Sequence, residues 1–182
     1  MKTVEVLFAV GWAAFWLYWA LAAYSTKQGR SPRSRELAVR LVIVAVAILL
    51  FRVDAFRSYG VNTDPRRAGA GLALLALGLG FAVWARVHIG RNWGTPMAQK
   101  DEPELVTSGP YRFVRHPIYS GILIAGIGTA VALSRLWLLA FALAGIYFVY
   151  SARVEERYLT AEFPDEYPPY KRSTKMLVPF VL

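Results

Sequence analysis

Five apolar segments, separated by short polar stretches, dominate the sequence. They run from Val4 to Tyr24, Leu37 to Phe56, Ala68 to Val87, Ile118 to Leu133 and Leu136 to Tyr150. A helix that crosses a bilayer needs about 20 residues, so the first three segments are long enough to span it. The last two are shorter and are joined only by Ser134 and Arg135, which predicts a tight helical hairpin. The pattern therefore predicts an all-α membrane protein with five transmembrane helices.

The first apolar segment also has some features of a secretory signal peptide. Lys2 precedes it, and Ala20-Leu21-Ala22 resembles a small-residue cleavage site. Its uninterrupted length and its Trp and Tyr residues favour a span that is kept in the mature protein.

The chain contains no long-period repeat or linker, which indicates one domain over residues 1–182. Residues 1–67 would hold the first two spans, and residues 68–182 would hold the last three with their polar connections. Glycines recur inside the later spans, at positions 69, 71, 78, 80, 121, 126 and 128. We interpret them as sites of close helix packing, because no strand precedes them as in a nucleotide-binding loop.

The amino-acid composition limits which kinds of active site the chain can form. The chain has 182 residues, of which 56% are hydrophobic, no cysteine and two histidines. Disulfides, thiolate metal sites and cysteine nucleophiles are excluded, and two histidines are too few for a zinc site without several carboxylates. We therefore expect no metal.

The formal net charge is +9. The cations lie between the apolar runs rather than along one face, which favours anionic lipid headgroups or an anionic substrate over nucleic acid. Most Lys and Arg residues fall on the side that holds residues 88–117 and the tail after residue 150. By the positive-inside rule this side is cytoplasmic, and the N-terminus is outside.

Polar residues gather where the fourth span begins, in the stretch GPYRFVRHPIYSG from Gly109 to Gly121. An antiparallel hairpin about the turn at residues 134 and 135 would bring His116 level with Arg153 and Val114 level with Glu155. The stretch SARVEERYLTAEF contains good helix formers and predicts that the fifth helix continues until Pro164 ends it. Arg115, His116, Arg153, Glu155, Glu156 and Arg157 would then crowd one end of the hairpin, either as an interfacial ion-pair cluster or as a functional site.

Aromatic residues accompany these charges: Trp93, Tyr111, Tyr119, Tyr158, Tyr167 and Tyr170. They could form an interfacial belt, or a cage whose ring faces attract a cationic ligand.

Four motifs on this side carry a family resemblance: GRNW (Gly90 to Trp93), LVTSGPYRFVRHPIYSG (Leu105 to Gly121), the Glu155-Glu156 pair, and FPDEYPPYK (Phe163 to Lys171). In this order and spacing they resemble the isoprenylcysteine carboxyl methyltransferase family and its phospholipid methyltransferase relatives. The resemblance covers about residues 86 to 180 and leaves the first two spans without a diagnostic motif.

The resemblance implies an integral-membrane methyltransferase that binds S-adenosylmethionine (SAM) and releases S-adenosylhomocysteine. Its acceptor would be a lipidic or prenylated molecule that enters from the bilayer, with a carboxylate as the methylated group. By the resemblance, the cofactor pocket would include Leu105, Val106, Tyr111, Arg115, His116, Pro117, Tyr119, Gly121, Glu155 and Glu156. The catalytic candidates are Glu155, Glu156 and Arg172.

One departure concerns the acceptor. The family often has Tyr-x-x-Arg before its last hydrophobic segment, and the position of that arginine is here Ser173, with Arg172 one place earlier. A carboxylate acceptor needs a cation to orient it but no base, whereas an amine acceptor must be neutral, and Glu155 or Glu156 could take its proton.

Two other functions stay open at this point. Sterol-type membrane reductases share a similar scaffold and motif but bind NADPH, and they often have an acidic residue where this chain has Ile122. A non-catalytic membrane protein that binds lipids or a partner is the second alternative.

Overall fold

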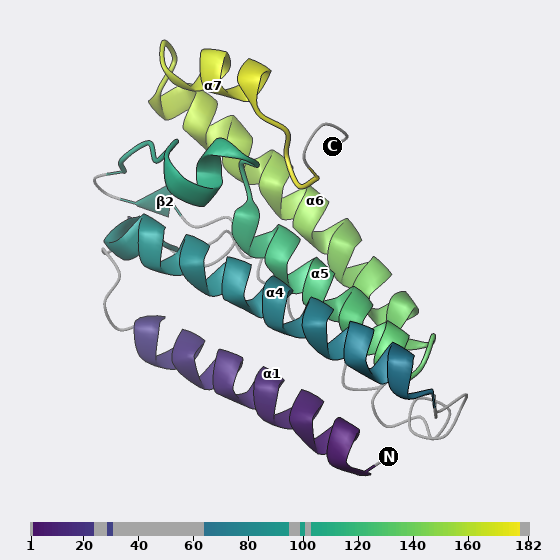
Figure 1. The fold of residues 1–182 in the computed structure, drawn as a ribbon. Coiled ribbons are helices and arrows are strands. Elements are labelled where there is room, and N and C mark those ends of the chain that lie inside the picture. Colours follow the sequence, from purple (N-terminus) through teal and green to yellow (C-terminus); the bar gives the residue numbers. More distant parts are fainter. Residues whose placement is uncertain (1, 24–28, 31–63, 95–98, 101–102, 179–182) are drawn as a thin grey trace.

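The computed structural model describes residues 2–23, 29–30, 64–94, 99–100 and 103–178. Helices form nearly all of the regular structure in this part of the chain (Figure 1). The α-helices are α1 (Lys2–Ala23), α4 (Pro65–Ile89), α5 (Pro117–Ala132), α6 (Trp137–Glu162) and α7 (Tyr167–Ser173). Two short 3-10 helices, η1 (Gly90–Asn92) and η2 (Gly109–Arg112), and an antiparallel pair of two-residue strands, β1 (Gly29–Arg30) and β2 (Gln99–Lys100), complete it.

Apolar helices follow four of the five predicted segments. Among the described residues, three stretches are long and apolar enough to cross a membrane: Thr3–Ala22, Pro65–Asn92 and Trp137–Glu162. Helix α5 is apolar but shorter, and the predicted span from Leu37 to Phe56 lies outside the described residues. The prediction of a helical integral membrane protein is therefore confirmed in these coarse terms.

Local sequence signals explain where the helices begin and end. Asp64 caps α4 by accepting a 2.9 Å hydrogen bond from the Arg66 amide, and Pro65 occupies the first turn. Pro117 likewise begins α5. Helix α6 continues past Tyr150 to Glu162, as predicted, and Pro164 follows its end.

Helices α4 and α5 pack closely through small residues. A Cβ atom added to Gly71 would lie 2.5 Å from the Gly128 carbonyl oxygen, and one added to Gly78 would lie 2.5 Å from that of Gly121. Close packing is thus confirmed for these four glycines. The prediction of close packing is wrong for Gly69 and Gly80, which are exposed and have no described atom within 4 Å of the added carbon.

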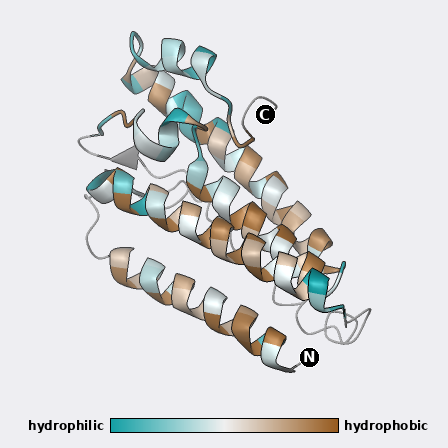
Figure 2. Cartoon of the chain, viewed as in Figure 1, coloured by the Kyte–Doolittle hydropathy of each residue, from teal (hydrophilic) through white to brown (hydrophobic). Residues whose placement is uncertain are grey.

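Helix α1 packs beside α4, and α5 lies between α4 and α6 (Figure 1). The Trp12 indole of α1 donates a 3.1 Å hydrogen bond to the Thr129 hydroxyl of α5, so the first helix contacts the third and fourth apolar segments alike. Exposed apolar side chains cover the outer faces, including Val10 and Leu17 on α1 and Leu139 and Ile146 on α6. Figure 2 shows hydrophobic residues along the helices and hydrophilic ones gathered around η2 and α7.

Candidate active site

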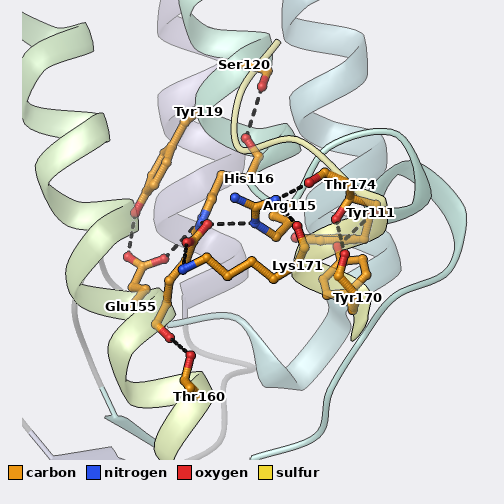
Figure 3. A network of polar contacts seen from close by, with 11 residues as sticks. Tyr111, Arg115, His116, Tyr119, Ser120, Glu155, Thr160, Tyr170, Lys171 and Thr174 are labelled. Atoms are coloured by element: carbon orange, nitrogen blue, oxygen red, sulfur yellow. Dashed lines mark hydrogen bonds and ion pairs between the residues drawn. The ribbon is translucent and has the colours of Figure 1, made fainter. Parts of the chain in front are cut away.

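A stack of rings joins α5 to α6 next to the polar end of the bundle. Tyr119 lies parallel to Phe148 with ring centroids 4.5 Å apart, and His116 stacks on Tyr119 at 5.5 Å. The Tyr119 hydroxyl then donates a 2.6 Å hydrogen bond to Glu155. These contacts place the histidine at the start of α5 beside the glutamates of α6 (Figure 3).

Glu156 is the buried centre of the charge cluster. Its side chain is only 3% exposed and accepts a 2.7 Å bond from Arg115 Nε and a 2.9 Å bond from Lys171 Nζ. His116 Nε2 lies 3.5 Å from the same carboxylate. A buried carboxylate needs such partners, because desolvation strongly disfavours an unpaired charge.

Glu155 is the more accessible of the two carboxylates. Its side chain is 24% exposed and faces the Tyr119 hydroxyl and His116 Nδ1, the latter at 3.5 Å. Burial favours the neutral ring of His116, but the two facing glutamates outweigh it and raise the pKa of this histidine above its ordinary value.

The segment after α7 lies against the start of α5 and completes this end of the fold. We call residues 174–177 the C-terminal strap. The Arg115 amide donates to the Lys175 carbonyl at 2.8 Å, and the His116 amide donates to the Met176 carbonyl at 3.0 Å. The Ser120 hydroxyl donates to the Leu177 carbonyl at 2.5 Å. The strap therefore holds the backbone that carries the site residues.

The guanidinium of Arg115 ties the strap to the cluster. Besides its bond to Glu156, it donates to the Lys171 carbonyl at 3.1 Å and to the Thr174 carbonyl. Its side chain is 8% exposed. Arg115 thus connects α5, α6 and α7 through one buried side chain.

Three tyrosines near the cluster, Tyr111, Tyr167 and Tyr170, act as neutral hydrogen-bond donors or as packing groups. The Tyr170 hydroxyl donates to the Tyr111 carbonyl at 2.7 Å, and Tyr167 is fully buried. Burial raises the pKa of Tyr170 to about 12 and also raises the pKa values of Tyr111 and Tyr167. Trp93, by contrast, lies under the Arg86 guanidinium, with 4.7 Å between Arg86 Cζ and the ring centroid.

The structure brings together five of the predicted site residues, namely Arg115, His116, Tyr119, Glu155 and Glu156. Pro117 is buried at the start of α5, and Gly121 faces Gly78 and Ala82 of α4. Leu105 and Val106 are half-buried in the segment before η2.

Arg172 is exposed on α7, while its neighbour Lys171 contacts Glu156. The exposed Arg153 and Arg157 also lie outside the described contacts of the cluster.

Sequence reasoning missed Lys171 and the strap. The signal for Lys171 was the inward face of α7, where residues 167, 171 and 174 recur at the spacing of one helix face. The strap had no such signal, because it pairs mainly through backbone atoms.

Comparison with known proteins identifies the family of this chain. The sequence model of the phospholipid methyltransferase family matches residues 67–166, more than half of the chain. Protein-S-isoprenylcysteine O-methyltransferase B of Arabidopsis thaliana is 34% identical over 116 residues, which are 61% of this chain and 58% of the relative. Protein-S-isoprenylcysteine O-methyltransferase of Schizosaccharomyces pombe is 33% identical over 115 residues, 60% of this chain and 48% of the relative.

A third relative, Methanethiol S-methyltransferase 1 of Bradyrhizobium diazoefficiens, is 40% identical over 78 residues, 43% of this chain and 27% of the relative. The chain spans 58% of the length of the first of these curated relatives and less than half of the other two. The matched region nonetheless contains α5 and both glutamates. The predicted resemblance is confirmed, and the chain belongs to the phospholipid methyltransferase family.

Proposed function

We propose that this protein is an integral-membrane methyltransferase that uses SAM to methylate a lipidic or prenylated acceptor. The observation that carries the proposal is the meeting of the RHPIYSG segment with the Glu155-Glu156 pair inside the region matched by the family. Both pieces belong to the motifs of the resemblance, and they lie in direct contact although some forty residues separate them in the sequence.

The chemistry of the side chains fits the proposed cofactor. SAM carries an amino group and ribose hydroxyls that suit carboxylates, and a carboxylate that suits a cation. The cluster offers the carboxylate of Glu155 and the ammonium of Lys171 on partly exposed side chains, 24% and 48% respectively. Of the other residues predicted to contact the cofactor, Tyr111, Leu105 and Val106 would line the side of the pocket formed by η2 and the segment before it.

When bound, SAM would supply an electrophilic methyl group, and its sulfur would keep the carbon–sulfur electron pair as a neutral thioether. The residues of this chain would align the two reactants and exclude water. Glu156 is already bonded to two cations, so Glu155 is the better placed carboxylate to take a proton from an amine acceptor.

We propose a carboxylate as the acceptor group, as in an isoprenylcysteine. Of the three relatives named above, two are named for O-methylation of isoprenylcysteine and one for S-methylation of methanethiol. A carboxylate would need no base and would be attracted by the cations at this end, with Arg172 as an exposed candidate on α7. An apolar acceptor tail would reach the site along the exposed apolar side chains of α6.

We further propose the five-span arrangement, with α5 and α6 as a hairpin, the N-terminus outside and the site on the cytoplasmic side. The excess of Lys and Arg on the site's side supports this orientation. The reductase and the non-catalytic alternatives are not favoured, because the family match and the relatives named above are methyltransferases.

The test is transfer of a radiolabelled methyl group from SAM by the detergent-purified protein. S-Farnesylated N-acetylcysteine and phosphatidylethanolamine vesicles would serve as alternative acceptors. We expect label in the farnesylated acid, released again by mild base as expected for a methyl ester. Label in the phospholipid amine would change the acceptor class. Label in neither acceptor would contradict the proposal that this protein methylates a prenylated carboxylate.

A further inference from the structure

Two hydrogen bonds fasten the segment before η2 to the residues where α4 ends. His88 Nε2 and the Ser108 hydroxyl lie 3.0 Å apart and form a hydrogen bond, in which the tautomer of the ring decides which group donates. The side-chain amide of Asn92, the last residue of η1, donates a 3.0 Å hydrogen bond to the Glu104 carboxylate. We call these four residues the clamp, because they hold the segment at both of its ends.

The His88 ring also lies against the turn that follows. Gly109 has a φ of 58°, a left-handed conformation that favours glycine. A Cβ atom added to it would lie 2.6 Å from His88 Cε1 and 2.7 Å from both ring nitrogens, so the imidazole lies directly against the Gly109 backbone. The Tyr111 ring stacks on the same imidazole, with centroids 6.5 Å apart. The position of the turn from Ser108 to Tyr111 therefore depends on His88.

The clamped segment continues into the neighbourhood of the charge cluster. Tyr111 is buried, and its hydroxyl donates a 3.5 Å hydrogen bond to the Ala85 carbonyl of α4. The Tyr111 carbonyl accepts the 2.7 Å bond from Tyr170 of α7. Figure 3 shows Tyr111 beside Tyr170 and Thr174. A shift of the clamped segment would therefore reach the residues around the cluster.

The clamp is made of surface residues. His88, Glu104 and Ser108 are exposed and Asn92 is half-buried. Replacing an exposed side chain usually changes the free energy of unfolding little. A clamp variant should therefore keep the fold, and a change in ligand binding would come from the position of the clamped segment.

Building on the proposed function, which assigns Leu105 and Val106 to the cofactor pocket, we propose that His88 and Asn92 are positioning residues for the methyl donor. Leu105 and Val106 lie between the two contacts of the clamp. The clamp would hold them in their binding conformation before SAM arrives, so that less conformational entropy is lost on binding. The GRNW motif would then act on the site through Asn92, its third residue.

The experiment measures SAM binding by calorimetry on the detergent-purified full chain. The test variants are His88→Ala, Asn92→Ala, Ser108→Ala and the double variant of His88 and Ser108. His88→Gln is the conservative variant, because its amide can donate or accept in place of Nε2. Thr107→Ala is the matched control, because it removes an exposed hydroxyl one residue before Ser108. Hydrogen exchange of residues 104–111 without ligand reports the clamp directly.

We expect His88→Ala, Asn92→Ala and Ser108→Ala each to raise the dissociation constant of SAM by about threefold to tenfold, the range of one hydrogen bond. The double variant should be no weaker than the weaker single variant, since both remove the same contact. His88→Gln and Thr107→Ala should stay within about twofold of wild type. Hydrogen exchange in residues 104–111 should become faster in His88→Ala, with a melting temperature within about 3 °C of wild type.

A kinetic measurement separates positioning from a general loss of structure. With whichever acceptor takes the methyl label, the KM for SAM should rise in His88→Ala while kcat at saturating SAM stays within about twofold, because bound SAM restores the segment. A fall in kcat with an unchanged dissociation constant would contradict the proposal.

Failure of this inference can be told from failure of the proposed function. If the wild type binds SAM and the three single alanine variants of the clamp bind it equally well, the clamp does not position the methyl donor and the proposed function stands. If the wild type binds neither SAM nor S-adenosylhomocysteine, the proposed function fails and this inference fails with it.

Discussion

Replacing Gly78 by alanine probes the close contact between α4 and α5 that positions His116 and Tyr119. The added Cβ would lie 2.5 Å from the Gly121 carbonyl oxygen, and its other near neighbours are backbone atoms of Ala125. A backbone atom cannot rotate away as a side chain can, so the helices must separate by about 1 Å to reach an ordinary contact distance. We expect a loss of unfolding free energy of about 1–3 kcal/mol, the usual cost of overpacking.

Gly80→Ala is the matched control, because it makes the same chemical change two residues along the same helix. Gly80 is exposed and has no described atom within 4 Å of an added Cβ. Alanine favours the helix over glycine by up to about 1 kcal/mol, so this variant should be as stable as wild type or slightly more stable.

The assay is thermal unfolding of both variants in the same detergent, followed by circular dichroism and by binding of SAM. The account predicts that Gly78→Ala melts at a lower temperature and binds SAM more weakly, while Gly80→Ala does neither. Equal melting temperatures for the two variants would refute the close packing of α4 against α5.

Three further predictions concern the site itself. Glu156→Gln leaves Arg115 beside a neutral amide and should cost about 1.5–3 kcal/mol of stability, with weaker SAM binding by calorimetry; wild-type values in both would remove its role. Ser120→Ala removes the bond to the Leu177 carbonyl, and we expect a loss of about 1 kcal/mol together with faster protease cleavage of the C-terminus. His116 has a raised pKa when folded, so its stabilising contribution is complete below about pH 6.5 and is lost as the pH rises through the folded pKa. The melting temperature should therefore fall more steeply with rising pH in wild type than in His116→Gln, and parallel curves would contradict this.

Most of the described helices could be predicted from the sequence, because a membrane helix requires a long run of apolar residues. The segment from Ala68 to Val87 became α4 (Pro65–Ile89), and Ile118 to Leu133 became α5 (Pro117–Ala132), with proline setting both starts. The polar continuation after Tyr150 was also predictable, because its residues favour a helix until Pro164.

The site was predictable only in part. The glutamate pair and His116 could be placed together from the antiparallel order of the last two apolar segments. After α6 the chain reverses, and α7 packs so that Lys171 rather than Arg172 faces Glu156. No apolar run in the sequence predicts this packing. Arg115 looked like a cofactor ligand in the sequence, but in the structure its donors go to Glu156 and to carbonyls of α7 and the strap.

The central claim is that this cluster binds the methyl donor. The most direct measurement is calorimetric titration of the detergent-purified protein with SAM, S-adenosylhomocysteine and NADPH in parallel. The account predicts saturable binding of the first two and none of NADPH, with loss of binding in folded His116→Ala. Binding of NADPH alone would indicate a reductase, and a folded protein that binds none of the three would contradict the methyltransferase assignment.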